Sequence, residues 1–162
     1  MRRVAHHSPP SPHHLTMKGT DAMGRENEDL LHEFMAAFAA GDDGTLRRLV
    51  HADIVDHTPP PGAAPGIDGL LYAVAGYRQG FPDLRISLEK VVADGQDVVG
   101  YGRIKGTHSG SFFGQEPTGR AVDFGYIDIY RVRDGKLADA WHLEDIAGLT
   151  RQIAATGLER SA

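Results

Sequence analysis

The spacing of apolar residues changes near Phe81, and this change constrains the fold more than any other feature of the sequence. Before Phe81, apolar residues recur every three or four positions, as on one face of a helix. After Phe81 they alternate with polar residues, as in strands, and Asp94-Gly95 and Asp134-Gly135 are hairpin-turn signals. The expected helices span residues 26–40, 43–50, 67–79 and 146–155, and the expected strands lie near 84–92, 98–105, 122–132 and 137–143. Helices followed by antiparallel strands predict an α+β domain in which the helices cover one face of a curved antiparallel sheet.

The length of 162 residues fits one domain with a tail. Residues 1–22 form the predicted flexible tail, because their histidines and prolines cannot bury apolar area. The four histidines between His6 and His14 could bind a metal or, as we favour, belong to a solvated terminus. Residues 23–162 are predicted to form the single domain.

Composition excludes several classes of protein. The chain has no cysteine, which rules out disulfides, zinc–cysteine sites and thiol nucleophiles. Its formal charge of −5 and its scattered basic residues argue against a nucleic-acid partner. No apolar run reaches the roughly 18 residues of a membrane span, and the N-terminus lacks the apolar stretch of a signal peptide. The expected location is therefore the cytoplasm, without a membrane partner.

One predicted strand, residues 122–132, sorts its side chains into two sets by alternation. One face combines apolar groups with a carboxylate and two phenols, and its members are Val122, Phe124, Tyr126, Asp128 and Tyr130. Such a face is typical of a small-molecule pocket, which needs apolar walls and a few convergent polar groups. A partly solvated face with an amphipathic Tyr130 is an equal alternative.

Trp141 and Asp145 are separated by three residues at the end of the last predicted strand, so an extended backbone brings both to one face. A carboxyl group that loses solvent beside an indole can take and return protons near neutral pH, which makes Asp145 a candidate acid/base. Asp145 could instead cap the helix expected from residue 146, the commoner role for such a residue. His142 is expected to face away from Trp141.

Two further histidines are candidate site residues. His57 precedes the proline loop at residues 58–62, where it could shuttle protons or be an ordinary half-buried histidine. His108 is expected in a loop or at a strand end. Their spacing with His142 matches no metal-ligand pattern, and the glycine-rich segment 106–120 matches no phosphate-binding loop. We therefore expect neither a metal site nor a cofactor.

Short motifs in a fixed order resemble one known family. They are Val55-Asp56-His57, Phe81-Pro82-Asp83-Leu84, Gly106-Thr107-His108, Pro117-Thr118-Gly119-Arg120, and Trp141-x-x-x-Asp145 followed by Gly148-Leu149-x-x-Gln152. Each motif is weak, but the ordered set over residues 26–156 is similar to the SnoaL-like polyketide cyclases of the NTF2-like superfamily. The resemblance implies a cone in which a curved antiparallel sheet and N-terminal helices enclose an apolar pocket.

The resemblance also implies a reaction. In these cyclases one aspartate of the Trp-x-x-x-Asp motif removes an activated proton from a polyketide ester. An intramolecular aldol reaction then closes a ring, and no metal or coenzyme is used. That role corresponds to Asp145, and the histidine that lines the family's pocket corresponds to His57. We expect a polyketide-like small molecule to contact six further residues: Trp141, Asp128, Tyr130, Phe124, Tyr126 and His108.

Other functions stay open from the sequence, because His142 and Glu144 depart from the residues usual in the family at these positions and one fold serves many functions. A hydroxylase or hydrolase could use Asp128, Tyr130 and Asp145 to activate water, and another cyclisation or isomerisation also fits. A non-catalytic binding protein would fit if side chains filled the pocket. In each case, the outer sheet face around residues 127–129 favours a homodimer or a higher homo-oligomer.

Overall fold

A computed structural model describes residues 18–112 and 114–154, and the side chains from residue 22 onward within these ranges. Most of the predicted tail, residues 1–17, lies outside the described residues. The elements are α1 (Lys18–Ala40), α2 (Asp43–Leu49), β1 (Val50–Asp56), α3 (Ile67–Gly80), β2 (Arg85–Asp94), β3 (Asp97–Thr107), β4 (Ala121–Arg133), β5 (Lys136–Glu144) and α4 (Ile146–Ala154). The predicted α+β class is confirmed, although α1 begins well before the start expected near residue 26.

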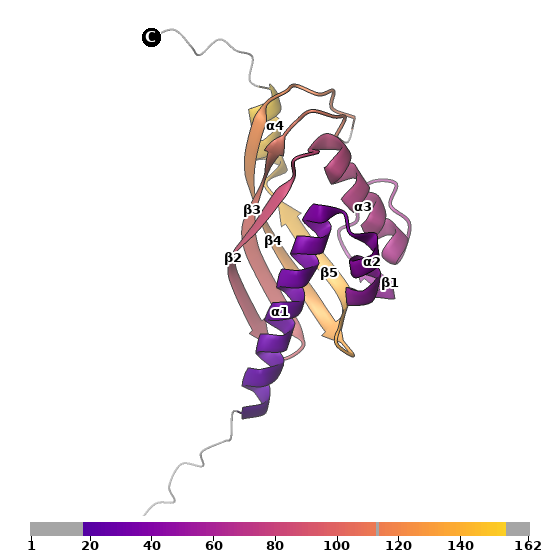
Figure 1. Cartoon of the computed structure of the whole chain (residues 1–162), viewed down its shortest axis with the longest axis vertical. Coiled ribbons are helices and arrows are strands. Elements are labelled where there is room, and N and C mark those ends of the chain that lie inside the picture. The colour runs from indigo at the N-terminus through magenta and orange to yellow at the C-terminus, as the bar shows by residue number, and fades with distance from the viewer. Residues whose placement is uncertain (1–17, 113, 155–162) are drawn as a thin grey trace, which may run out of the picture.

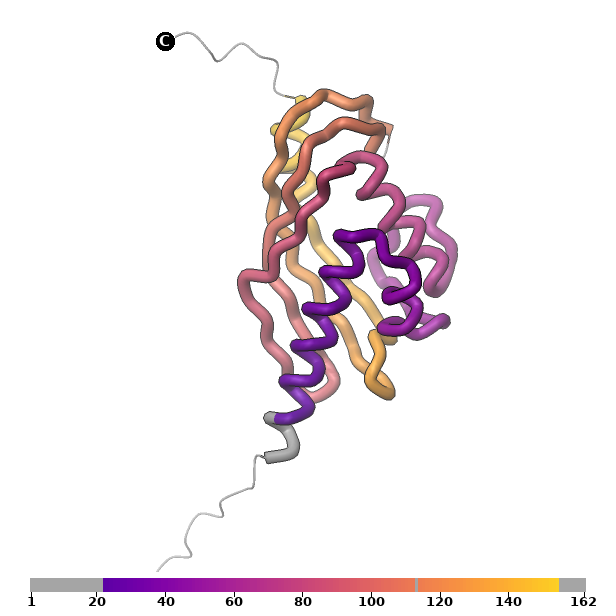
Figure 2. The backbone as a smooth tube through the Cα atoms, viewed as in Figure 1, coloured from indigo at the N-terminus to yellow at the C-terminus, as the bar shows by residue number. Residues whose placement is uncertain are grey.

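Five strands form one open sheet in the order β1-β5-β4-β3-β2. Strands β2 to β5 are antiparallel neighbours, whereas β1 runs parallel to β5. The helices α1, α2 and α3 lie on one side of the curved sheet, and α4 lies near the start of β4 (Figure 1). The backbone trace in Figure 2 follows the two hairpins that build most of the sheet, β2–β3 and β4–β5.

Strand β1 is the element that the apolar spacing did not predict, and it makes the sheet mixed where a purely antiparallel sheet was expected. Val50 and Ile54 are its buried residues, Ala52 between them is exposed, and the helix expected over residues 43–50 included the first residue of the strand. Its register with β5 shifts between Val50 and Val55. The strand forms because β5, far along the chain, offers an unpaired edge, and a local pattern cannot show such a partner.

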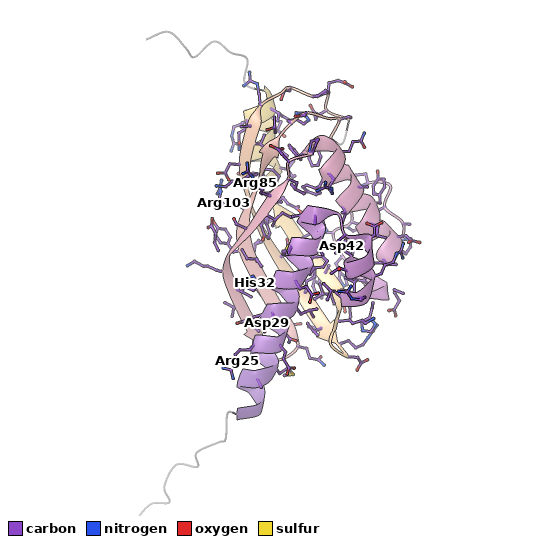
Figure 3. The ribbon with its side chains drawn as sticks, viewed as in Figure 1. Arg25, Asp29, His32, Asp42, Arg85 and Arg103 are labelled. Carbon is purple, nitrogen blue, oxygen red and sulfur yellow. The ribbon has the colours of Figure 1, made fainter. Side chains whose placement is uncertain are left out.

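Helix α1 packs its apolar side on the sheet. Leu31 and Phe34 are fully buried, and the ring of Phe34 meets that of Tyr130 edge to face at 5.2 Å between centroids. Arg25, Asp29 and His32 follow one another along the exposed side of the same helix (Figure 3). Of the helices in the described ranges, none combines the length and the apolar character that a membrane crossing requires.

Gly102 in β3 leaves room for a tyrosine of the neighbouring strand. A Cβ atom at this position would lie 1.8 Å from the Ser87 carbonyl oxygen and 2.9 Å from the Tyr126 hydroxyl. The Tyr126 hydroxyl instead donates a hydrogen bond to that Ser87 oxygen at 3.2 Å. Three strands thereby fix Tyr126 on the inner face of the sheet.

Candidate active site

A cavity of about 70 Å³ lies between the inner face of the sheet and helices α1 and α3. Most of its walls are apolar, formed by Met35, Phe38, Ile54, Gly66, Leu70, Ala73, Ile86, Ile104 and Ala140. Its polar groups are Asp56, Tyr77, Tyr126, Asp128, Tyr130, His142 and Glu144. Apolar walls with a few convergent polar groups suit a small-molecule site, and side chains do not fill this one.

Strand β4 points Tyr126, Asp128 and Tyr130 into the cavity, which confirms the predicted alternation. Asp128 is only 7% exposed, and its Oδ2 accepts a hydrogen bond from the Tyr130 hydroxyl at 3.2 Å. Its Oδ1 is buried and has no hydrogen-bond partner among the described residues. Burial, and next the negative charge of Glu144, raise the pKa of Asp128 to about 7. The carboxyl group can therefore gain or lose a proton near neutral pH.

Strand β5 contributes His142 and Glu144, and β1 contributes Asp56. His142 Nδ1 lies 3.2 Å from Glu144 Oε1, and Nε2 lies 3.1 Å from Asp56 Oδ2. Burial lowers the pKa of His142, but the hydrogen bonds and charges of Glu144 and Asp56 outweigh it and raise the pKa to about 9. The imidazole is thus a cation at neutral pH, held between two carboxylates. The sheet register places it directly beside Asp128 on the neighbouring strand.

The tyrosines stay protonated and act as hydrogen-bond donors. Burial, followed by the charge of Asp128 and a hydrogen bond to it, raises the pKa of Tyr130 well above its usual range. Burial also raises the pKa of Tyr77, with the charges of Glu144 and Asp128 and a hydrogen bond to Glu144 adding to the effect. The cavity therefore offers proton exchange at Asp128 and a fixed positive charge at His142, between aromatic and aliphatic walls.

The model of the SnoaL-like polyketide cyclase family matches residues 28–153. The chain belongs to this family.

Solved structures agree with the SnoaL-like assignment and with the predicted NTF2-like cone. TsrD from Streptomyces laurentii is 30% identical with a TM-score of 0.75, over 82% of this chain and 97% of its own. IdmH from Streptomyces antibioticus, a candidate polyketide cyclase, is 31% identical with a TM-score of 0.70, and the match covers 79% of this chain and 98% of IdmH. AclR from Streptomyces galilaeus, a candidate hydroxylase, is 24% identical with a TM-score of 0.70, over 80% and 81%, and shows the shared fold alone. No protein of curated function matches the sequence.

The structure places Asp145, the acid/base that the SnoaL-like resemblance implied, outside the cavity lining. Strand β5 ends at Glu144, so Asp145 does not continue the alternation that was expected to join it to Trp141. Its Oδ1 accepts a hydrogen bond from the Gly148 amide at 2.7 Å, and its carbonyl oxygen accepts one from the Leu149 amide at 3.0 Å. Asp145 is exposed and begins helix α4, which is the alternative role noted from the sequence.

His57 and Trp141 also lie outside the cavity lining of this SnoaL-like chain, where they pack on each other. Their rings stack in parallel with centroids 4.3 Å apart, and His57 Nε2 lies 3.0 Å from Asp139 Oδ1. The Arg131 guanidinium lies 5.9 Å from the centre of the Trp141 ring. Asp139, Trp141 and Arg131 alternate with the cavity-lining residues of β4 and β5, so this cluster lies on the outer face of the sheet.

Phe124 and His108 are buried near the cavity without lining it. Phe124 contacts Phe81, and His108 is fully buried with its ring 5.6 Å from that of Phe81. His108 Nδ1 lies 3.1 Å from Thr118 Oγ1, while Nε2 has no hydrogen-bond partner among the described residues. Both residues pack the protein rather than form the walls of the site.

Sequence reasoning missed Asp56, Tyr77, His142 and Glu144 as cavity residues. The alternation of Ala140, His142 and Glu144 along β5 was a usable signal, because these residues fall on the face opposite Trp141. Asp56 falls on the face of Ile54 by alternation, but its contact with His142 depends on the parallel pairing of β1 with β5, which no local pattern shows. In residues 18–112 and 114–154, no three acidic or histidine side chains are arranged to hold a metal ion.

Proposed function

We propose that this protein is a cyclase of secondary metabolism that closes a ring by intramolecular carbon–carbon bond formation, with Asp128 as the acid/base. The observation that carries the proposal is the Asp128 carboxyl group, which faces a mostly apolar cavity with one oxygen free and a pKa of about 7. Membership of the SnoaL-like polyketide cyclases supports the reaction class.

The proposed reaction is an aldol cyclisation. The Asp128 carboxylate takes a proton from a substrate carbon between two carbonyl groups, and the electron pair moves onto a carbonyl oxygen as an enolate. The enolate carbon attacks a second carbonyl carbon of the same molecule and forms the new bond. The resulting alkoxide takes the proton back from Asp128. Product and substrate are isomers, and the steps consume neither an oxidant nor a coenzyme.

The surrounding residues suit this sequence of steps. The imidazolium of His142 lies on the strand next to Asp128, where its charge stabilises the enolate and the alkoxide. Asp56 and Glu144 keep that charge in place by bonding both ring nitrogens. The apolar walls hold the substrate in a folded conformation. The enolate carbon and the carbonyl carbon that it attacks are thereby kept close together before they react.

The test compares Asp128→Asn with wild type on the methyl ester of an aromatic β-keto acid that carries a ketone placed for six-membered ring closure. We expect Asp128→Asn to lower kcat by at least about 100-fold, because the amide cannot accept the proton. In the wild type, kcat/KM should rise as the pH passes about 7, because Asp128 ionises there. It should fall near pH 9, because His142 loses its charge there.

Asp145→Asn is the matched control, since it removes the same charge from the carboxyl group that caps α4. It should keep most of the activity and cost at most about 1 kcal/mol of stability, because asparagine also caps helices. Full activity of Asp128→Asn together with an inactive, folded Asp145→Asn would return the acid/base role to Asp145. A product heavier than the substrate by one oxygen atom would favour a hydroxylase instead.

We also propose that the protein forms a homodimer through the outer face of the sheet. Tyr101, Ile127 and Leu143 are direct cross-strand neighbours on β3, β4 and β5, and their exposed fractions are 38%, 43% and 70%. Ile129, exposed by 40%, extends this row toward Trp141. An apolar patch across three strands is typical of a surface that another protein covers.

A further inference from the structure

The charges that line the cavity do not balance. Three carboxyl groups face it, those of Asp56, Asp128 and Glu144, and its lining contains one histidine but neither lysine nor arginine. Both nitrogens of His142 are already engaged, with Asp56 on one side and Glu144 on the other. The single positive charge is therefore shared by two carboxylates, and no cation of the lining is left for Asp128.

Asp128 presents an unused acceptor to this space. Its Oδ2 is bonded to the Tyr130 hydroxyl, but its Oδ1 is buried without a hydrogen-bond partner among the described residues. A buried carboxylate oxygen without a partner is costly, and a ligand that donates a hydrogen bond removes that cost. A ligand that also brings a positive charge corrects the imbalance of the lining at the same time.

Aromatic rings complete a site of this kind. Tyr77, Tyr126 and Tyr130 line the cavity together with Phe38, whose ring packs edge to face on Tyr77 at 5.7 Å. The faces of such rings carry negative electrostatic potential and attract organic cations. A carboxylic acid or phosphate group would face three carboxyl groups, and the one basic residue of the lining, His142, is already bonded to Asp56 and Glu144.

We propose that this cavity also binds molecules with a protonated amine, which donates a hydrogen bond to Asp128 Oδ1 and lies among the tyrosine rings. This inference goes beyond the proposed function, because an amine on Oδ1 occupies the oxygen that the proposed cyclisation uses as its base and so competes with the substrate. Because the amine binds best to the ionised carboxylate, binding near neutral pH displaces a proton from Asp128 into solvent.

The test uses four probes of one shape, namely benzylamine, benzyl alcohol, toluene and benzoate, by isothermal titration calorimetry and NMR. The Kd of benzylamine should be at least about tenfold lower than that of benzyl alcohol at pH 6.5, with benzoate the weakest. The binding heat of benzylamine should vary with the ionisation enthalpy of the buffer, which reports the released proton, whereas that of benzyl alcohol should not.

Two variants locate the effect. Asp128→Asn should bring the benzylamine and benzyl alcohol affinities to within about twofold and abolish proton release. Asp68→Asn, which removes an exposed carboxylate outside the cavity lining, should keep the preference and so exclude a general effect of net charge. The inference is overturned if benzylamine does not bind, if benzyl alcohol or benzoate binds as tightly, or if Asp128→Asn keeps the preference.

Failure of this inference and failure of the proposed function are distinguishable, because the probes do not react. If the wild type prefers the amine but Asp128→Asn still closes rings, the ligand class is supported and the catalytic role of Asp128 is wrong. If Asp128→Asn no longer closes rings but the wild type shows no preference for the amine, the catalytic role of Asp128 is supported and the amine ligand is wrong.

Discussion

At the scale of the residue, Asp128 shows how burial turns an ordinary carboxyl group into a group that titrates near neutral pH. Loss of solvent is the largest cause, and the negative charge of Glu144 adds to it, while the cation of His142 opposes both. His142 is shifted the other way, toward the charged form, because it has a carboxylate on each ring nitrogen. Two neighbouring groups thereby differ at neutral pH: Asp128 exchanges a proton, and His142 is a cation.

The same ionisation predicts how stability depends on pH. Between about pH 4 and pH 7 the folded protein keeps a proton on Asp128 that the unfolded chain has lost, so stability falls as the pH rises through this window. His142 contributes stability that is complete below its ordinary pKa of 6.5 and is lost as the pH rises through about 9. We therefore expect the free energy of unfolding to be lower at pH 8 than at pH 5.

Asp128→Asn isolates the part that Asp128 plays. The amide has no proton to lose, so at pH 8 the variant should exceed the wild type in unfolding free energy by on the order of 1–3 kcal/mol, and this excess should be smaller at pH 5. Urea unfolding followed by circular dichroism at both pH values measures this. Equal pH dependence in the two proteins would show that Asp128 titrates normally.

At the scale of the element, the site depends on the residue at which β5 ends and on a glycine within β3. Strand β5 ends at Glu144, which leaves His142 and Glu144 on the inner face and places Asp145 directly before α4. Gly102 in β3 leaves the space in which Tyr126 reaches the Ser87 carbonyl oxygen. These are backbone features, so substitutions at them act on the cavity through geometry rather than chemistry.

Gly102→Ala tests the second feature. Its methyl group would overlap the Ser87 carbonyl oxygen, so we expect a loss of about 1–3 kcal/mol in unfolding stability, with lower activity as Tyr126 moves. Gly76→Ala in α3 is the matched control, because no atom lies within 4 Å of the new methyl group. That variant should gain about 0.5–1 kcal/mol, as expected for alanine in a helix. Similar melting temperatures for the two variants would contradict the proposed role of Gly102.

At the scale of the whole molecule, the sheet separates two surfaces of different character. The inner face, which α1, α2 and α3 cover (Figure 1), carries the cavity. The outer face carries an apolar row that includes Ile127 and Ile129, beside the stacked rings of His57 and Trp141. Alternation along β4 and β5 keeps the two surfaces apart, so association through one leaves the other free.

Ile127→Glu tests the proposed homodimer. A buried glutamate facing its own copy across a two-fold axis is strongly unfavourable, so the variant should be monomeric at micromolar concentration while the wild type is dimeric. Light scattering coupled to size-exclusion chromatography measures both masses. Tyr72→Glu, which changes an exposed aromatic residue on α3, should remain dimeric. A monomeric wild type would remove the dimer from the proposal.

Much of the fold could be predicted because its signals are local. Helical spacing, alternation and two turn dipeptides located most of the elements, and alternation placed Asp128 and Tyr130 on the face that lines the cavity. Two differences arise where the chain enters or leaves regular structure. Extending the strand by one residue past Glu144 put Asp145 on the face of Trp141, and reading residues 54–57 without a strand left Asp56 unplaced.

The sequence by itself determined the α+β class, the family resemblance and the inner face of β4, because each depends on residues close together in the chain. The tertiary structure alone decided which ionisable groups meet. Asp56 and His142 come together through the parallel pairing of β1 with β5, and Asp128 lies beside His142 through the register of β4 with β5. Burial and neighbouring charge, which depend on those long-range pairings, then set the pKa values on which the proposed chemistry depends.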